Sequence, residues 1–218
     1  MSTESRAQTR LVSYTFICFA LIYLCSLPFK PYMLSFLVKA FPIACLCLFI
    51  WVSRPVKKGR LVATGLLFSA VGDILLDLPQ DTFFIPGMGS FIMAHLFYTA
   101  AFFGRPVFSL SRMSVLAAVI IFVTGYGIFL FPHLGDMAPA IYIYLFVISI
   151  MVASACTGRD NNMLIISGAC LFMISDSMIA LTMFVIPVPF ADIWIMSTYY
   201  AAQALLSSGA YYSLSTQP

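Results

Sequence analysis

The chain has 218 residues, of which 62% are hydrophobic and only 9% are charged, and its mean hydropathy is +1.01. Soluble domains carry about 25% charged residues, so this composition excludes an ordinary soluble fold and favours a protein that exposes apolar surface to lipid. The formal net charge of +3 is small, and beyond short basic loops nothing indicates nucleic-acid binding.

Apolar segments follow one another along the whole chain, each close to the roughly 20 residues that cross a bilayer as a helix. They are apolar throughout rather than alternating with polar residues, which predicts helices and not barrel strands. The predicted spans are Leu11–Pro28, Pro31–Val52, Leu61–Leu78, Ile85–Phe103, Arg112–Phe131, Met137–Cys156, Met163–Met183 and Ala191–Tyr212. We therefore expect an all-α, eight-helix membrane bundle, with a single domain over residues 11–212 and short tails at 1–10 and 213–218.

The basic residues are distributed unevenly over the predicted loops. With the N-terminus in the cytoplasm, nine Lys and Arg side chains fall on the cytoplasmic side, and only Lys30 falls on the other side. Cytoplasmic loops of membrane proteins carry such an excess of positive charge. Both termini are therefore predicted to be cytoplasmic, which agrees with an even number of spans.

A weak internal repeat relates the two halves of the chain at an offset of 103 residues. The most informative matches are Gly65 with Gly168, Asp73 with Asp176, and Pro86 with Pro189. Because the offset covers four spans, the halves would run parallel and be related by an axis along the membrane normal. Such a four-plus-four repeat would place the two aspartates at equivalent depth.

A few ionisable residues lie inside predicted spans. Placing a charge in the membrane costs about 2.5–3.5 kcal/mol, so such residues are candidates for a functional site. At 1.5 Å per residue, Asp73 lies roughly 18 Å and Asp176 roughly 20 Å from the cytoplasmic edge of the hydrocarbon core. Lys39, His95 and Tyr199 lie roughly 12–15 Å from the opposite edge. All five residues fall in one layer, which indicates one site.

Further polar residues extend this layer toward the non-cytoplasmic side. Asp77 follows Asp73 by one helical turn, and Tyr200 lies beside Tyr199. Tyr98 follows His95 by one turn, and Gln203 follows Tyr199 in the same way. The sequence thus predicts a polar pocket that opens outward.

Structural interpretations remain open for each of these residues. Asp73 could end its helix or pair with Lys39 only to hold two helices together. Lys39 could be the counter-ion of the aspartates or extend to the interface. His95 could be a hydrogen-bonded structural residue, and Tyr199 and Tyr200 could be ordinary packing aromatics.

Two buried carboxyl groups at one depth can divide acid and base roles between them. One remains protonated and acts as the acid, while the other is kept ionised by Lys39 or by hydrogen bonds. Such a pair suits acid-catalysed cleavage through an oxocarbenium-like state, and it also suits proton-linked transport. A zinc site is not expected, because its three protein ligands are commonly His or Cys and only His95 lies inside a span. We expect neither a metal nor a cofactor.

Several segments in these spans resemble the YhhN-like transmembrane lysoplasmalogenases, and the vertebrate members are the most similar. The segments are Leu37–Pro42, Phe68–Asp73, His95–Tyr98, Gly168–Asp176 and Ile195–Gln203. The resemblance extends over nearly the whole chain.

This resemblance implies hydrolysis of the vinyl-ether bond of lysoplasmalogens, giving a fatty aldehyde and glycerophosphocholine or glycerophosphoethanolamine. It also implies residence in the endoplasmic reticulum membrane. On this hypothesis Asp73 and Asp176 are catalytic, and Lys39, His95 and Tyr199 tune them or hold the polar part of the lipid. The alternatives are a proton-linked transporter of lysolipids or small solutes with the same aspartates, and an enzyme acting on another lysolipid bond. A homo-oligomer is compatible with the sequence.

Overall fold

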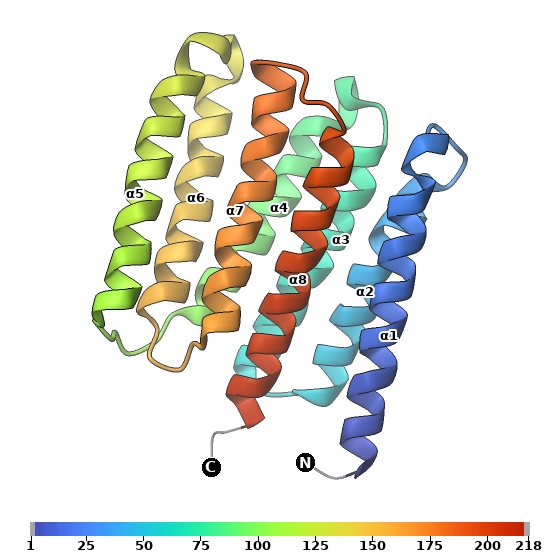
Figure 1. Ribbon diagram of the computed structural model, residues 1–218, viewed down its shortest axis with the longest axis vertical. Helices are drawn as coiled ribbons and strands as arrows, with labels where there is room; N and C mark the ends of the chain where they lie inside the picture. The colour runs from blue at the N-terminus through green and yellow to red at the C-terminus, as the bar shows by residue number, and fades with distance from the viewer. Residues whose placement is uncertain (1–2, 216–218) are drawn as a thin grey trace.

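The computed structural model describes residues 3–215 and consists of eight long helices that run up and down in one bundle (Figure 1). The helices are α1 (Thr3–Ser26), α2 (Ser35–Ser53), α3 (Lys57–Asp77), α4 (Gln80–Phe102), α5 (Leu110–Leu130), α6 (Ala138–Thr157), α7 (Met163–Phe184) and α8 (Ala191–Ser215). Short 3₁₀ turns occupy Leu27–Phe29, Phe131–His133 and Gly135–Met137. The described residues contain no strand, and the predicted all-α membrane bundle is confirmed.

Seven of the eight helices are long and apolar enough to cross a membrane, which makes this a multi-pass membrane protein. The helix that does not meet this criterion is α8, because tyrosine, serine and glutamine interrupt its apolar sequence. It nevertheless lies alongside the others in the bundle (Figure 1), packing against α7 and contacting α1, α2 and α3. Tyr199, Tyr200, Gln203 and Ser207 of this helix are buried against protein, and its role as an eighth span stays a prediction.

Close helix pairs build the centre of the bundle, and small residues make them possible. A Cβ atom on Gly65 of α3 would lie 2.5 Å from the Tyr98 ring of α4. A Cβ atom on Gly168 of α7 would lie 3.0 Å from the Ala202 carbonyl oxygen of α8. Small residues at helix interfaces allow backbones to approach closely in membrane proteins. The α3–α4 and α7–α8 pairs carry the aspartates, so these contacts fix where the carboxyl groups lie.

The two chain ends lie at the same end of the bundle (Figure 1). At this end Arg112, in the first turn of α5, donates to the carbonyl oxygens of Gly158 at 2.8 Å and Asn161 at 2.6 Å in the α6–α7 connection. The Asn161 amide in turn donates to the Phe102 carbonyl oxygen at 2.8 Å. This network ties together the ends of α4, α5, α6 and α7.

Helix ends differ from the predicted spans mainly where polar residues continue a helix. The first helix begins at Thr3 rather than Leu11, and α4 begins at Gln80 rather than Ile85. α2 begins at Ser35, four residues later than predicted, because the turn after α1 occupies the intervening loop. Residues 1–2 and 216–218, which belong to the two predicted tails, lie outside the described residues.

Candidate functional site

Asp73 is buried in the centre of the bundle and is 1% exposed. The Tyr199 hydroxyl of α8 donates a hydrogen bond of 2.7 Å to its Oδ2 atom. The Lys39 ammonium of α2 lies 3.7 Å from its Oδ1 atom. Asp73 thus has one hydrogen-bond donor and one cation beside it, brought from two other helices, and it does not face lipid.

Asp176 is also directed into the bundle, and its side chain is 9% exposed. The Tyr144 hydroxyl of α6 donates a hydrogen bond of 2.6 Å to its Oδ2 atom. The His95 Nε2 atom of α4 lies 3.6 Å from the same oxygen. No Lys or Arg forms an ion pair with Asp176 among the residues that the structure describes.

His95 is fully buried, and neither of its ring nitrogens has a hydrogen-bond partner. Its ring packs edge-on against Phe172 at 4.7 Å and against Tyr144 at 5.4 Å between centroids. A buried polar group without a partner costs free energy, so this ring is held by its aromatic neighbours and not by hydrogen bonds. Its free nitrogens are available to a ligand or water in the site.

Aromatic rings connect the surroundings of the two aspartates. Tyr199 packs against Phe172 at 5.4 Å and against Phe91 at 5.9 Å between ring centroids. Phe172 in turn contacts His95, which lies beside Asp176. The carboxyl groups of Asp73 and Asp176 are close enough to interact electrostatically, while each keeps its own set of donors. The site therefore has two carboxyl groups in two different environments.

The partners of the two aspartates come from corresponding helices of the two halves. Each carboxyl group has a neighbour on the helix before its own, namely Lys39 on α2 and Tyr144 on α6. Each also has a neighbour on the last helix of the opposite half, which is Tyr199 on α8 for Asp73 and His95 on α4 for Asp176. The first four and last four helices are thereby joined at both acids.

The other predicted site residues surround this centre. The Tyr98 hydroxyl donates to the Gln203 Oε1 atom at 2.8 Å, and both side chains are fully buried. The Tyr200 hydroxyl donates to the backbone carbonyl oxygen of Lys39 at 2.8 Å, so it positions α2 and makes no bond to an aspartate. Asp77 accepts from Lys30 and from Ser35, and it lies nearer the end of the bundle.

Tyr144 and Lys30 are neighbours of the acids that sequence reasoning missed. Tyr144 lies in an apolar span at the depth of the aspartates, and that depth was the only signal in the sequence. Lys30 was assigned to an outer loop without a partner, although the α1–α2 turn carries it to Asp77. The Phe91 and Phe172 rings gave no signal, because phenylalanine is common throughout the chain.

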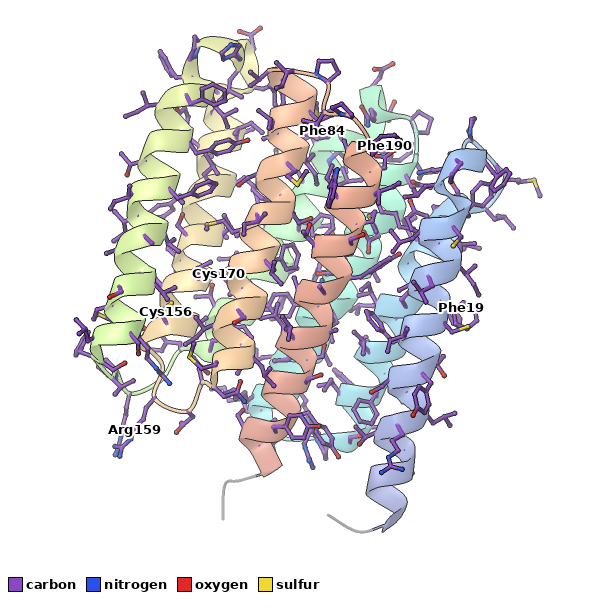
Figure 2. The ribbon with its side chains drawn as sticks, viewed as in Figure 1. Phe19, Phe84, Cys156, Arg159, Cys170 and Phe190 are labelled. Atoms are coloured by element: carbon purple, nitrogen blue, oxygen red, sulfur yellow. The ribbon has the colours of Figure 1, made fainter. Side chains whose placement is uncertain are left out.

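Two pockets reach the site from the end of the bundle opposite the termini. The apolar pocket is narrow, with a cavity volume of about 50 Å³, and is lined by residues that include Met88, Ile148, Met173, Tyr144 and Asp176. The polar pocket is larger, about 580 Å³, and is lined by residues that include Tyr23, Lys30, Lys39, Asp77, Thr182 and Asp192. The two share a wall formed by Leu76, Phe84 and Ile179. Phe84 lies near the end of the bundle that also carries Phe190 (Figure 2).

The pocket contacts separate the two acids. Asp176 lines the apolar pocket directly, whereas Asp73 lies behind Lys39, which lines the polar pocket. Among the described residues, no group of three or more His, Cys, Asp or Glu side chains is placed to hold a metal ion. The arrangement can offer one carboxyl group to an apolar ligand, with a second carboxyl group and its lysine partner nearby.

Comparison with known proteins finds several that are similar in sequence to this chain. It is 35% identical over 197 residues to a protein from Bos taurus named lysoplasmalogenase TMEM86A, covering 83% of this chain and 80% of that protein. It is 37% identical over 180 residues to lysoplasmalogenase TMEM86B from Mus musculus, covering 81% of this chain and 75% of the relative. A lysoplasmalogenase from Mycobacterium tuberculosis is 30% identical over 168 residues, covering 74% of this chain and 64% of the relative.

No solved structure matches the chain. The model of the YhhN family matches residues 34–210, which include α2 to α7 entirely and most of α8. Both aspartates and all the side chains that contact them lie within this range. The chain therefore belongs to the YhhN family.

Proposed function

We propose that this protein is a lysoplasmalogenase, which hydrolyses the vinyl-ether bond of alkenyl-glycerophosphocholine or alkenyl-glycerophosphoethanolamine. The relatives that bear this name support the proposal. The observation that carries it is the carboxyl group of Asp176 in the wall of an apolar pocket, beside a second buried carboxyl group. A vinyl ether needs a proton on carbon, and this pocket would bring a hydrocarbon chain to an acid.

In the proposed reaction Asp176 is the general acid. It gives its proton to the vinyl carbon distal to the ether oxygen, and the carbon next to oxygen becomes part of an oxocarbenium ion. The negative charge of Asp73 stabilises this cation across the aromatic contacts. Water adds to the cation and releases a proton to the Asp176 carboxylate, giving a hemiacetal. The hemiacetal collapses to the fatty aldehyde and the free glycerol hydroxyl, so that one water is consumed.

The different surroundings of the two acids support this division. Lys39 lies beside Asp73 and favours its ionised form. Asp176 lies in the wall of an apolar pocket and has no Lys or Arg ion pair among the described residues, which favours the neutral acid until it reacts, and the Tyr144 hydroxyl is placed to stabilise the carboxylate that then forms. Tyr199 orients Asp73, and the buried Tyr98–Gln203 pair supports Tyr199 from one turn further along α8.

The charge distribution of the loops supports a placement in the membrane. We propose that both termini are cytoplasmic, that the pockets open on the other side, and that the protein resides in the endoplasmic reticulum as a single eight-span domain. The matching positions of the partners of the two aspartates support a parallel four-plus-four repeat.

Protein purified in detergent and supplied with lysoplasmalogen tests the proposal through release of fatty aldehyde. General acid–base groups contribute about 10²–10⁴-fold to rates, so Asp176→Asn and Asp73→Asn should each lower the rate by at least about a hundredfold. Asp136→Asn is the matched control, because Asp136 is exposed in the α5–α6 connection at the same end.

Folded Asp176→Asn and Asp73→Asn variants with the normal rate would contradict the catalytic assignment. Release of fatty acid instead of aldehyde would indicate a different lysolipid bond. A protein that releases no product in detergent but moves lysolipid across vesicle membranes would be a transporter.

A further inference from the structure

The polar pocket carries charges of both signs in a fixed order. Lys39 lies deepest, beside Asp73, and Lys30 lies further out, where its ammonium group bonds Asp77. Asp192, in the first turn of α8, is exposed in the pocket wall and forms no ion pair with any described residue. The pocket therefore holds two lysines, each paired with an aspartate, and further out the carboxylate of Asp192, which has no ion pair with any described residue.

One polar side chain in this wall has no partner within the protein. The Thr182 hydroxyl oxygen is buried, lines the polar pocket and makes no hydrogen bond with any described residue. Buried hydroxyl groups in folded proteins are nearly always hydrogen-bonded, so an unpaired one in a pocket wall indicates a ligand or water there.

We propose that the polar pocket binds the zwitterionic glycerophospho head group of a single-chain lipid whose first chain carbons enter the apolar pocket. The phosphate would face Lys30 and Lys39, and the ammonium group at the end of the head group would face Asp192. The Thr182 hydroxyl would bond the free hydroxyl of the glycerol. The identity of the lipid rests on the proposed function, but the binding itself requires no hydrolysis.

The shared wall explains how one molecule would occupy both pockets. Leu76, Phe84 and Ile179 line both, so the link between glycerol and chain would pass between these side chains. The first carbons of the chain would then enter the apolar pocket on the side where Asp176 lies. A second chain on the glycerol would have to leave through the polar pocket, so the site should bind single-chain lipids better than two-chain lipids.

A saturated ether lipid separates binding from chemistry, because it has no double bond to protonate. We would measure binding of 1-O-hexadecyl-glycerophosphocholine and of 1-O-hexadecyl-glycerophosphate, which lacks the ammonium group, to detergent-purified protein. Asp192→Lys should weaken binding of the choline lipid at least about fivefold and strengthen binding of the phosphate lipid, since it replaces an attraction by a repulsion. Asp136→Lys, at the same end but outside the pocket, should change neither affinity.

Thr182→Val tests the contact with the glycerol hydroxyl. It should weaken the binding of both lipids about threefold to tenfold, as expected for one lost hydrogen bond. Thr198→Val is the control, because the Thr198 hydroxyl bonds only the backbone of its own helix. The proposal would be overturned if Asp192→Lys changed the affinities for the two lipids no more than Asp136→Lys does. It would also be overturned if Thr182→Val bound both lipids with the affinity of the wild type.

The two proposals can fail separately in this design. If the wild type releases no aldehyde but Asp192→Lys reverses the lipid preference, the enzymatic proposal fails and the head-group site stands. If aldehyde is released and the preference does not change, the head-group site is wrong and the enzymatic proposal stands.

Discussion

Replacing Tyr144 by phenylalanine isolates one hydrogen bond to the proposed acid. The Tyr144 hydroxyl donates to Asp176 at 2.6 Å, and the ring itself would remain in the apolar pocket wall. A bond to a neutral partner contributes about 1 kcal/mol, whereas a bond to a charged one contributes about 1.5–3 kcal/mol. Because Asp176 becomes a carboxylate as it gives up its proton, the bond strengthens during the reaction. The difference of about 0.5–2 kcal/mol predicts that Tyr144→Phe lowers kcat by about twofold to thirtyfold.

The assay is aldehyde release in detergent across a range of lysoplasmalogen concentrations, so that kcat and KM are obtained separately. KM should change little, since the substrate loses no direct contact with the hydroxyl. Tyr142→Phe is the matched control on the same helix, because its hydroxyl bonds the backbone carbonyl oxygen of Gly127 at 2.8 Å and does not reach an aspartate. A kcat for Tyr144→Phe within twofold of the wild type, or the same loss in Tyr142→Phe, would refute the reasoning.

Two further predictions concern stability, read from thermal unfolding in detergent. Lys39→Met leaves Asp73 buried without its cation and should destabilise the protein by about 3–5 kcal/mol. Adding Asp73→Asn to this variant should restore most of the unfolding midpoint but no activity. A Lys39→Met protein as stable as the wild type would exclude an ion pair between Lys39 and Asp73 at 3.7 Å. Gly168→Ala would place a Cβ atom 3.0 Å from an α8 carbonyl oxygen and should lower the free energy of unfolding by about 1–3 kcal/mol. Gly125→Ala is the control, because its Cβ atom would meet nothing within 4 Å and should not destabilise the protein. Equal unfolding midpoints for the two variants would contradict the close approach of α7 and α8.

The sequence predicted the helical membrane bundle because lipid permits few alternatives for the backbone. Long apolar segments must satisfy their hydrogen bonds internally, so seven of the eight helices and their order follow from hydropathy. Helix ends were less accurate, as at Gln80, where a polar first turn precedes the apolar run. Hydropathy detects the membrane core and not the helix that continues beyond it.

The depth of polar residues also brought Asp73, Asp176, Lys39, His95 and Tyr199 together correctly as one neighbourhood. Depth gives one coordinate along the membrane normal, but it does not tell which face of a helix a side chain occupies.

For that reason the sequence could not separate Tyr144, which contacts an acid, from Tyr142, which bonds a neighbouring backbone. The sequence also could not show which side chain contacts Asp73 and which contacts Asp176. Those assignments depend on how the helices pack sideways, and apolar sequences with few distinguishing residues carry little information about it.

Each aspartate contacts a side chain from the opposite half of the chain, and this has a consequence for biosynthesis. Helices α1 to α4 are made first and contain Asp73, Lys39 and His95, but Tyr199 arrives only with the last helix. Asp176 likewise meets His95 only after α7 has joined the earlier helices. A nascent or truncated chain would hold either acid without its full set of neighbours, so competence for chemistry would coincide with completion of membrane insertion. Two separately expressed halves should regain the centre only by finding each other in the bilayer.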